Sequence, residues 1–238
     1  MSLIRPTNDN SLLSRKPRSP LFVGFSCTLL SPIHFIKNPL QWLTLIDRYQ
    51  VTTSGGPNFA YALCTKLLKS GCNSFDLSSW QVAFCGAEPL RADPLQQFCE
   101  RTQRFNFNSQ AFHPCYGLAE HTLIATGRRY LTGMSTVLSQ DPDYPQLYVS
   151  CGEAIAGHEV VIVDPASKKV CAGGQVGEVW LQGPSVTRGY WNKPELTKTT
   201  FHAYIEDGRG PFLRTGDLGF LDNNELSLVG RINDMIII

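Results

Sequence analysis

One short stretch of the sequence combines three residue types that suit a nucleotide: Tyr116, Gly117 and Glu120. A tyrosine ring can stack on a base, and a glycine lets the main chain approach a ligand closely. A carboxylate can hold a Mg²⁺ ion that bridges phosphate oxygens. The same spacing also fits a helix start with a capping glutamate and a packed tyrosine, so both interpretations stay open for this stretch taken alone.

Two further residues near the end of the sequence extend the same chemistry. Asp217 follows Arg214, Thr215 and Gly216 in a predicted turn, and its acceptor-only carboxylate could receive both hydroxyls of a ribose diol. Arg231 offers a fork of donors suited to phosphate or ribose oxygens. An ordinary loop aspartate and a surface salt bridge are the alternatives. If these residues form one site, Asp217 and Arg231 should lie close together, with the Tyr116 stretch facing them.

The elements that must position these residues follow from the hydrophobic pattern. From residue 21 onwards, short apolar runs alternate with amphipathic segments, which predicts strands and helices around a largely parallel sheet. Ligands in such sheets bind beyond the carboxyl ends of the strands, so the site is expected in glycine-bearing loops. Strands are expected at 21–25, 51–53 and 82–85, helices at 38–49, 58–69 and 93–103, and the loops at 54–57, 86–89 and 116–120.

The second half of the sequence has a different hydrophobic pattern. Three β-rich segments, at 158–164, 176–183 and 225–230, are separated by glycine and proline turns and one short helical segment near 194–201. This pattern predicts a second, mainly antiparallel, barrel-like subdomain. The expected organisation is an irregular lead-in (1–20), an α/β subdomain (21–146), a β-rich subdomain (147–230) and a hinge end (231–238).

Composition excludes several classes of protein. With 42% hydrophobic and 17% charged residues the chain is typical of a folded globular protein. The 21 basic residues nearly balance the 20 acidic ones, which gives no reason to expect nucleic acid or an anionic membrane as a partner. The apolar run at 21–30 is far shorter than the roughly twenty residues that span a bilayer. Eight cysteines without a C-x-x-C pair indicate reduced thiols of a cytoplasmic protein rather than a disulfide framework or zinc site.

The order and spacing of the motifs resemble those of the acyl- and aryl-adenylate-forming enzymes, most closely the branch of fatty acyl-AMP ligases that feeds polyketide and lipid assembly. Ala119 supports this branch, because most of the superfamily has a threonine there. The resemblance rests on PLFVGF (20–25), SGGPNFAYALC (54–64), CGAEPL (85–90), YGLAE (116–120), SCGEA (150–154), VGEVWLQGPSVTRGYWNKPE (176–195), PFLRTGDLGFL (211–221) and GRINDMIII (230–238).

The resemblance implies a reaction and a set of site residues. The reaction is ATP-dependent activation of a fatty acid to acyl-AMP with Mg²⁺, followed by transfer to an acyl carrier protein or polyketide synthase domain. The implied nucleotide-binding residues are Gly86, Ala87, Glu88, Tyr116, Gly117, Asp217 and Arg231. Glu120 is the implied catalytic residue and Mg²⁺ ligand. Ser54, Gly55, Gly56 and Phe59 would line part of the acyl pocket, and Asn233 would be the hinge.

The sequence also departs from the family. It contains no Ser/Thr/Gly-rich loop ending in Pro-Lys-Gly, the loop that grips the triphosphate in the family, and no C-terminal domain with its adenylation lysine. At Asn233 relatives usually have lysine or aspartate. We therefore expect a truncated ligase, equivalent to the second half of the large adenylating domain and with little activity in isolation. A non-catalytic AMP- or acyl-AMP-binding or complementing module and an inactive gene remnant are the alternatives.

Overall fold

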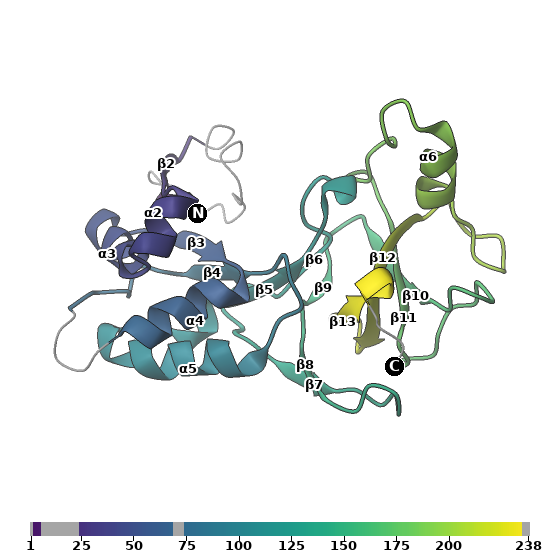
Figure 1. Ribbon diagram of the computed structural model, residues 1–238. Helices are drawn as coiled ribbons and strands as arrows, with labels where there is room; N and C mark the ends of the chain where they lie inside the picture. The colour runs from purple at the N-terminus through teal and green to yellow at the C-terminus, as the bar shows by residue number, and fades with distance from the viewer. Residues whose placement is uncertain (1, 6–23, 69–73, 235–238) are drawn as a thin grey trace. The chain divides into compact units, whose positions relative to one another are not determined.

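The computed structural model describes residues 2–5, 24–68 and 74–234, and the chain forms two compact units (Figure 1). The first unit contains Met1–His113 and Arg129–Met134, and the second contains Pro114–Arg128 and Ser135–Ile238. The domain ranges expected from the sequence stay predictions, because compactness alone does not define a domain. Most of the expected lead-in lies outside the described residues.

The first unit contains a mixed sheet with the strand order β2-β1-β3-β4-β5. β3 and β4 are parallel, whereas β1 is antiparallel to both of its neighbours. The strands are β1 (Ser2–Arg5), β2 (Ser26–Leu29), β3 (Thr53–Gly56), β4 (Val82–Cys85) and β5 (Phe112–Tyr116), which continues into the second unit. β1 falls in the segment expected to be irregular, and its backbone pairing with two strands explains why local composition did not indicate it. The first three residues of the strand expected at 21–25 lie outside the described residues.

Four α-helices accompany this sheet in the described part of the first unit: α2 (Pro32–Lys37), α3 (Leu40–Tyr49), α4 (Asn58–Leu67) and α5 (Ala92–Thr102). The three helices expected from the sequence are present, and α2 was not expected. α5 begins one residue before Asp93, the predicted cap, which instead lies in the first turn where its negative charge favours the helix dipole. The predicted end of α4 at Gly71 lies outside the described residues.

An aromatic cluster forms the core of the first unit. Its rings come from the helices, from β5 and from the segments that join them: Trp42, Tyr61, Trp80, Phe98, Phe107 and Phe112. The polar atoms of these rings are satisfied, since Trp42 Nε1 donates to Ser54 Oγ at 2.9 Å and Tyr61 OH donates to the Phe84 carbonyl at 2.8 Å. Such large rings stabilise a core when their polar ends find partners.

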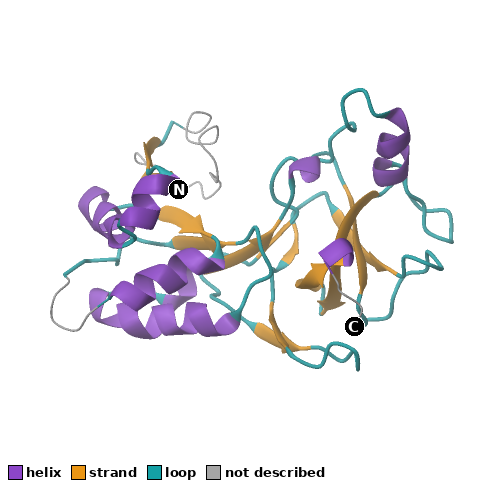
Figure 2. Cartoon of the chain, viewed as in Figure 1, coloured by secondary structure: helices purple, strands orange, loops and turns teal. Residues whose placement is uncertain are grey.

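Strands dominate the second unit (Figure 2). A four-stranded antiparallel sheet has the order β10 (Glu159–Val163), β11 (Gly177–Gln182), β12 (Leu213–Asp222) and β13 (Glu225–Arg231). β6 (Thr126–Gly127) pairs with the end of β5 and with β9 (Glu153–Ala154), while β7 (Thr136–Leu138) pairs with β8 (Leu147–Val149). α6 (Pro194–Phe201) is the helix expected near 194–201.

Three segments differ locally from the sequence expectation. Ser54–Gly56 was expected as a loop but belongs to β3, where a Cβ on Gly55 would lie 2.0 Å from the Phe84 carbonyl oxygen. The segment 214–217 was expected as a turn but lies within β12. The Tyr116 stretch, for which a helix start was the alternative to a loop, contains only a 3₁₀ turn, η3 (Ala119–His121). In each case packing against a distant segment overrides the local preference.

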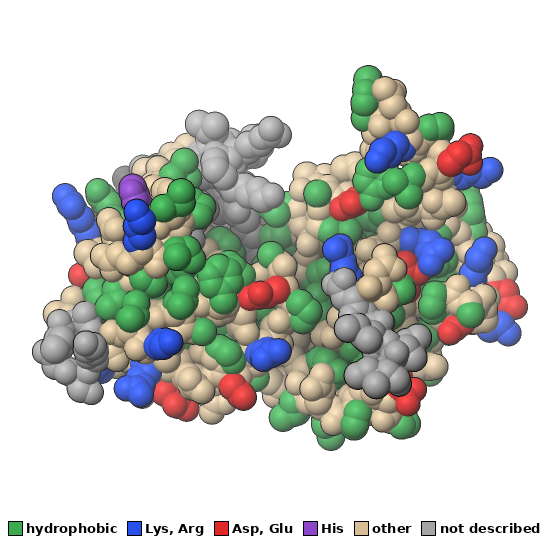
Figure 3. Space-filling model, in the orientation of Figure 1, with side chains coloured by type: hydrophobic (Ala, Val, Ile, Leu, Met, Phe, Trp, Pro, Cys, Tyr) green, Lys and Arg blue, Asp and Glu red, His purple; other side chains and the backbone are tan. Residues whose placement is uncertain are grey.

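Lys and Arg side chains are interspersed with Asp and Glu on the face shown in Figure 3. Within the part of the chain that the structure describes, no helix is both long and apolar enough to cross a bilayer.

Candidate nucleotide site

Asp217 is the centre of a hydrogen-bonded cluster in the second unit. Its Oδ2 accepts from the Tyr116 hydroxyl at 2.7 Å, and its Oδ1 accepts from Arg231 Nε at 2.9 Å. Asp217 and Arg231 are cross-strand partners of β12 and β13, whereas Tyr116 is the last residue of β5. The fold therefore brings together three side chains that the sequence places in separate motifs.

Burial differs sharply across this cluster. Tyr116 is only 6% exposed, whereas the side chains of Asp217 and Arg231 are 16% and 58% exposed. Burial and the neighbouring Asp217 charge raise the pKa of Tyr116 well above its usual range, so its hydroxyl remains a donor. Because a carboxylate has about four acceptor sites, Asp217 can still receive the hydroxyls of a diol. Little of the Tyr116 ring is open, so its stacking on a base stays a prediction.

Glu120 lies in η3 and contacts the segment that follows β11. Its Oε1 accepts from the Tyr190 hydroxyl at 2.7 Å, and its backbone carbonyl accepts from Thr187 N at 2.7 Å. Partial burial and the hydrogen bond to Glu120 raise the pKa of Tyr190 to about 12. Glu120 is partly exposed, and an oxygen-only ligand of this kind suits Mg²⁺. The donor type thus fits the predicted metal, while the assignment itself stays a prediction.

Gly117 is required by the fold around it. A Cβ at this position would lie 1.7 Å from the Leu123 carbonyl oxygen, because the chain turns back on itself after η3. This close approach of main chain to main chain explains the glycine without a ligand. The predicted nucleotide contact of Gly117 stays a prediction.

The loop after β4 carries the other three predicted nucleotide residues, all in the first unit. Ala87 has a positive φ of 72°, which is uncommon for a residue other than glycine and often marks a functional site. Glu88 Oε1 accepts from Phe59 N at 3.2 Å, in the first turn of α4. The preceding Gly86 is half-buried.

A cavity beside this loop joins two groups of predicted residues. It has a volume of about 400 Å³, and both Glu88 and the predicted acyl-pocket residue Phe59 line it. The other lining residues are Asn58, Ala62, Pro89, Arg91 and Pro94. Phe59 is 48% exposed, so an apolar ring is available at the cavity.

The other predicted acyl-pocket residues and the predicted hinge lie elsewhere. Ser54, Gly55 and Gly56 are buried in β3, and Ser54 Oγ is already bonded to Trp42. Asn233 is exposed in the 3₁₀ turn η4 (Ile232–Asp234). Their roles in an acyl pocket and a hinge stay predictions.

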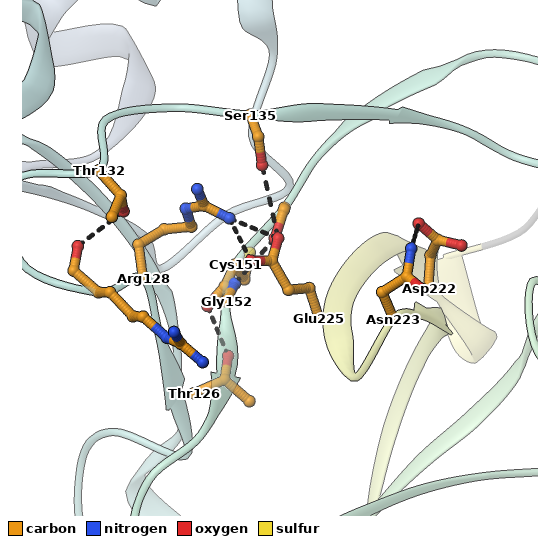
Figure 4. Close-up of polar contacts among 11 residues, drawn as sticks. Thr126, Arg128, Thr132, Ser135, Cys151, Gly152, Asp222, Asn223 and Glu225 are labelled. Atoms are coloured by element: carbon orange, nitrogen blue, oxygen red, sulfur yellow. Dashed lines mark hydrogen bonds and ion pairs between the residues drawn. The ribbon is translucent and has the colours of Figure 1, made fainter.

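A partly buried ion pair that the sequence did not indicate lies in the second unit (Figure 4). The Glu225 carboxylate pairs with Arg128, accepts from Ser150 Oγ at 2.6 Å and is 3.5 Å from Ser135 Oγ. Ser150 Oγ in turn accepts from Gly152 N at 3.0 Å. These contacts tie β13 to the ends of β6 and β8, and no local sequence signal marks them.

A second group missed by the sequence analysis surrounds the 3₁₀ turn that carries Glu120. His158 Nε2 lies 2.5 Å from Ser185 Oγ, which lies 3.3 Å from His121 Nδ1. His121 is fully buried, and both its burial and the neighbouring His158 lower its pKa. This cluster fastens η3 to the segment after β11 and so helps to place Glu120.

Both the fold and the motif order are those of an adenylating domain. The chain belongs to the AMP-binding enzyme family, which it matches over residues 17–191. Among solved structures it resembles the fatty acyl-adenylate ligase from L. pneumophila in complex with acyl adenylate and pyrophosphate. The TM-score is 0.85 at 43% identity, covering 92% of this chain and 41% of that one.

Curated relatives point to the same branch. The chain is 43% identical to the medium-chain fatty acid–acyl carrier protein ligase JamA of Moorena producens, covering 92% of this chain and 40% of the relative. It is 34% identical to the long-chain fatty acid–AMP ligase FadD23 of Mycobacterium tuberculosis, covering 92% and 41%. The chain therefore spans about 40% of the length of these relatives.

Proposed function

We propose that this chain is part of a fatty acyl-AMP ligase, which uses ATP to convert a fatty acid to acyl-AMP. The observation that carries the proposal is the cluster of Tyr116, Asp217 and Arg231, which places an acceptor carboxylate and a guanidinium side by side. The similarity to an acyl-adenylate-bound ligase supports it.

Within this function, Asp217 accepts the ribose hydroxyls and Arg231 donates to ribose or phosphate oxygens. Tyr116 holds one Asp217 oxygen in place through a buried hydrogen bond. Gly86, Ala87 and Glu88 contact the adenine, and the unusual backbone of Ala87 supports a functional loop there.

Glu120 is the residue that would hold Mg²⁺. Bound there, Mg²⁺ would supply charge neutralisation for the phosphate oxygens of ATP. The chain's own contribution is to fix Glu120, through the Tyr190 hydroxyl on one side-chain oxygen and through Thr187 on the backbone carbonyl. A carboxylate whose orientation is set before binding loses less entropy when the metal arrives.

The substrate and partner proposals follow the relatives' names. A fatty acid would enter beside Ser54, Gly55, Gly56 and Phe59, and the apolar Phe59 ring in its cavity supports this. The acyl group would pass to an acyl carrier protein or a polyketide synthase domain, and not to nucleic acid or a membrane. The seven described cysteines are free, which supports a reducing, cytoplasmic setting.

A second candidate is a module that binds AMP or acyl-AMP without catalysis, or that complements another chain. The cluster of Tyr116, Asp217 and Arg231 suits nucleotide binding by itself, without a reaction, and so is compatible with this candidate. Calorimetry with AMP and 2′,3′-dideoxy-AMP tests the site shared by both candidates. We expect AMP to bind and the dideoxy analogue to bind at least about tenfold more weakly, since a lost hydrogen bond to a charged group amounts to about 1.5–3 kcal/mol.

Equal binding of the two nucleotides, or none, would contradict the nucleotide site. Pyrophosphate exchange from ATP then separates the candidates: exchange above that of a Glu120→Ala control supports the ligase, and AMP binding without exchange supports the binding module. Losing one electrostatic contact in such a site commonly lowers a rate about a hundredfold or more, so the control is informative.

A further inference from the structure

A buried carboxylate on β11 contacts the segment that carries Asp217. Glu178 is 1% exposed and lies in a strand whose other residues are almost all buried and apolar. An unpaired charge in such a place would be strongly unfavourable, so its partners define what it does.

Those partners are two parts of the same short segment of β12. Arg214 donates to Glu178 Oε2 through Nε at 3.1 Å and through Nη2 at 2.7 Å, while Gly216 N donates to Oε1 at 3.1 Å. The Arg214 guanidinium also lies over the buried Trp180 ring, 5.5 Å from its centroid. One carboxylate therefore holds both a side chain and a backbone amide of the segment that precedes Asp217.

The register between β11 and β12 explains why the segment 214–217 depends on these hydrogen bonds. Glu178 pairs with Leu218 and Trp180 pairs with Arg214, so the single residue Val179 faces Thr215, Gly216 and Asp217. This three-against-one bulge interrupts the regular pairing of β12 with β11, and bulges commonly re-aim a side chain. Gly216 takes a φ of +71° within it.

A hydroxyl closes the other side of the bulge. Thr215 Oγ1 donates to the Val179 carbonyl at 2.7 Å and accepts from Asp217 N at 3.0 Å. Glu178 and Thr215 together fix the backbone from Arg214 to Asp217, and that backbone aims the Asp217 carboxylate at its two partners.

We propose that Glu178 is a positioning residue for Asp217: it shapes the β12 bulge so that the Asp217 carboxylate is preset to receive a ribose diol. This inference rests on the proposed nucleotide function for the ligand. A carboxylate is needed because both of its oxygens accept. A glutamine offers one acceptor oxygen, and its NH₂ group would face either the guanidinium or the Gly216 amide.

The test combines hydrogen exchange of the Gly216 and Asp217 amides with calorimetric AMP binding, on the full chain. For Glu178→Gln we expect exchange of both amides to accelerate at least about tenfold and AMP affinity to fall about tenfold. The matched control is Glu225→Gln, which removes another partly buried carboxylate from the same sheet, at the opposite end of the β12–β13 pair. Because local opening of the bulge, rather than global unfolding, governs exchange of these two amides, the control should leave their exchange and AMP affinity unchanged although it lowers global stability.

The outcomes separate the two ideas. Unchanged amide exchange in a folded Glu178→Gln variant would overturn the positioning role, as would equal changes in the control. If the wild-type chain binds no AMP, the nucleotide function fails, while accelerated exchange confined to Glu178→Gln still supports the role in the bulge. Should Glu178→Gln not fold, Thr215→Val, which removes the opposite side of the same bulge, is expected to give the same two changes, and its failure to do so would count against the proposal.

Discussion

Replacing Asp217 with asparagine should weaken AMP binding far more than it destabilises the fold. The side chain receives one hydrogen bond on each oxygen, from Tyr116 at 2.7 Å and from Arg231 at 2.9 Å. An asparagine keeps one acceptor oxygen, which can face the buried Tyr116 hydroxyl, and presents an NH₂ group to Arg231. Because Arg231 is 58% exposed, the loss of that ion pair should amount to less than about 1 kcal/mol.

The effect on binding is larger because the ligand depends on the remaining lone pairs. An NH₂ group cannot accept, so at least one ribose hydroxyl loses its charged acceptor, which corresponds to about 1.5–3 kcal/mol. That range is a loss of affinity of about ten- to hundredfold. The expected fall in melting temperature is only a few degrees, since about 1 kcal/mol shifts a chain of this size by ~2–4 °C.

The assay is calorimetric titration of AMP into the wild type, Asp217→Asn and a matched control. Asp222→Asn is the control, because Asp222 lies in the same strand, and its side chain bonds to the exposed neighbour Asn223. Circular dichroism checks that each variant is folded. An Asp217→Asn variant that binds AMP as the wild type does, or a control that loses equal affinity, would refute the reasoning.

Three further predictions concern stability and reactivity. Glu225→Gln should lower the free energy of unfolding by about 2 kcal/mol, because the partly buried Arg128 loses its ion pair with Glu225; urea unfolding measures this, and a change below about 0.5 kcal/mol would contradict it. Because the pKa of His121 is lower in the folded chain, the unfolded chain takes up a proton more readily. The folded state therefore keeps its full stability above the unfolded pKa near 6.5 and loses stability as pH falls below that value. The urea midpoint should therefore drop more between pH 7 and pH 5 in the wild type than in His121→Gln, and equal drops would remove His121 as the cause. Burial raises the pKa of Cys64 to about 12, so iodoacetamide at pH 8 should label it at least about a hundredfold more slowly in the folded chain than in urea, as peptide mapping can show.

Local pattern alone determined much of the secondary structure. The strand at 82–85 and the helix at 194–201 lie where the sequence placed them, because each has a strong periodicity bounded by turn or proline signals. The motif order likewise indicated the family, which the comparison over residues 17–191 shows. These features depend on neighbouring residues, so a sequence is enough to find them.

Only the tertiary structure decided how the site residues are held. Tyr116 and Asp217 are separated by 101 residues, and their hydrogen bond depends on where β5 and β12 come to lie. The bulge at Asp217 could not be predicted from the sequence either, because it arises from the register of β12 against β11, in which three residues face one. The role of Glu178 could not be predicted from the sequence for the same reason. It depends on the groups that this buried carboxylate contacts, and the pairing between strands that sets those contacts is fixed by the whole sheet rather than by local sequence.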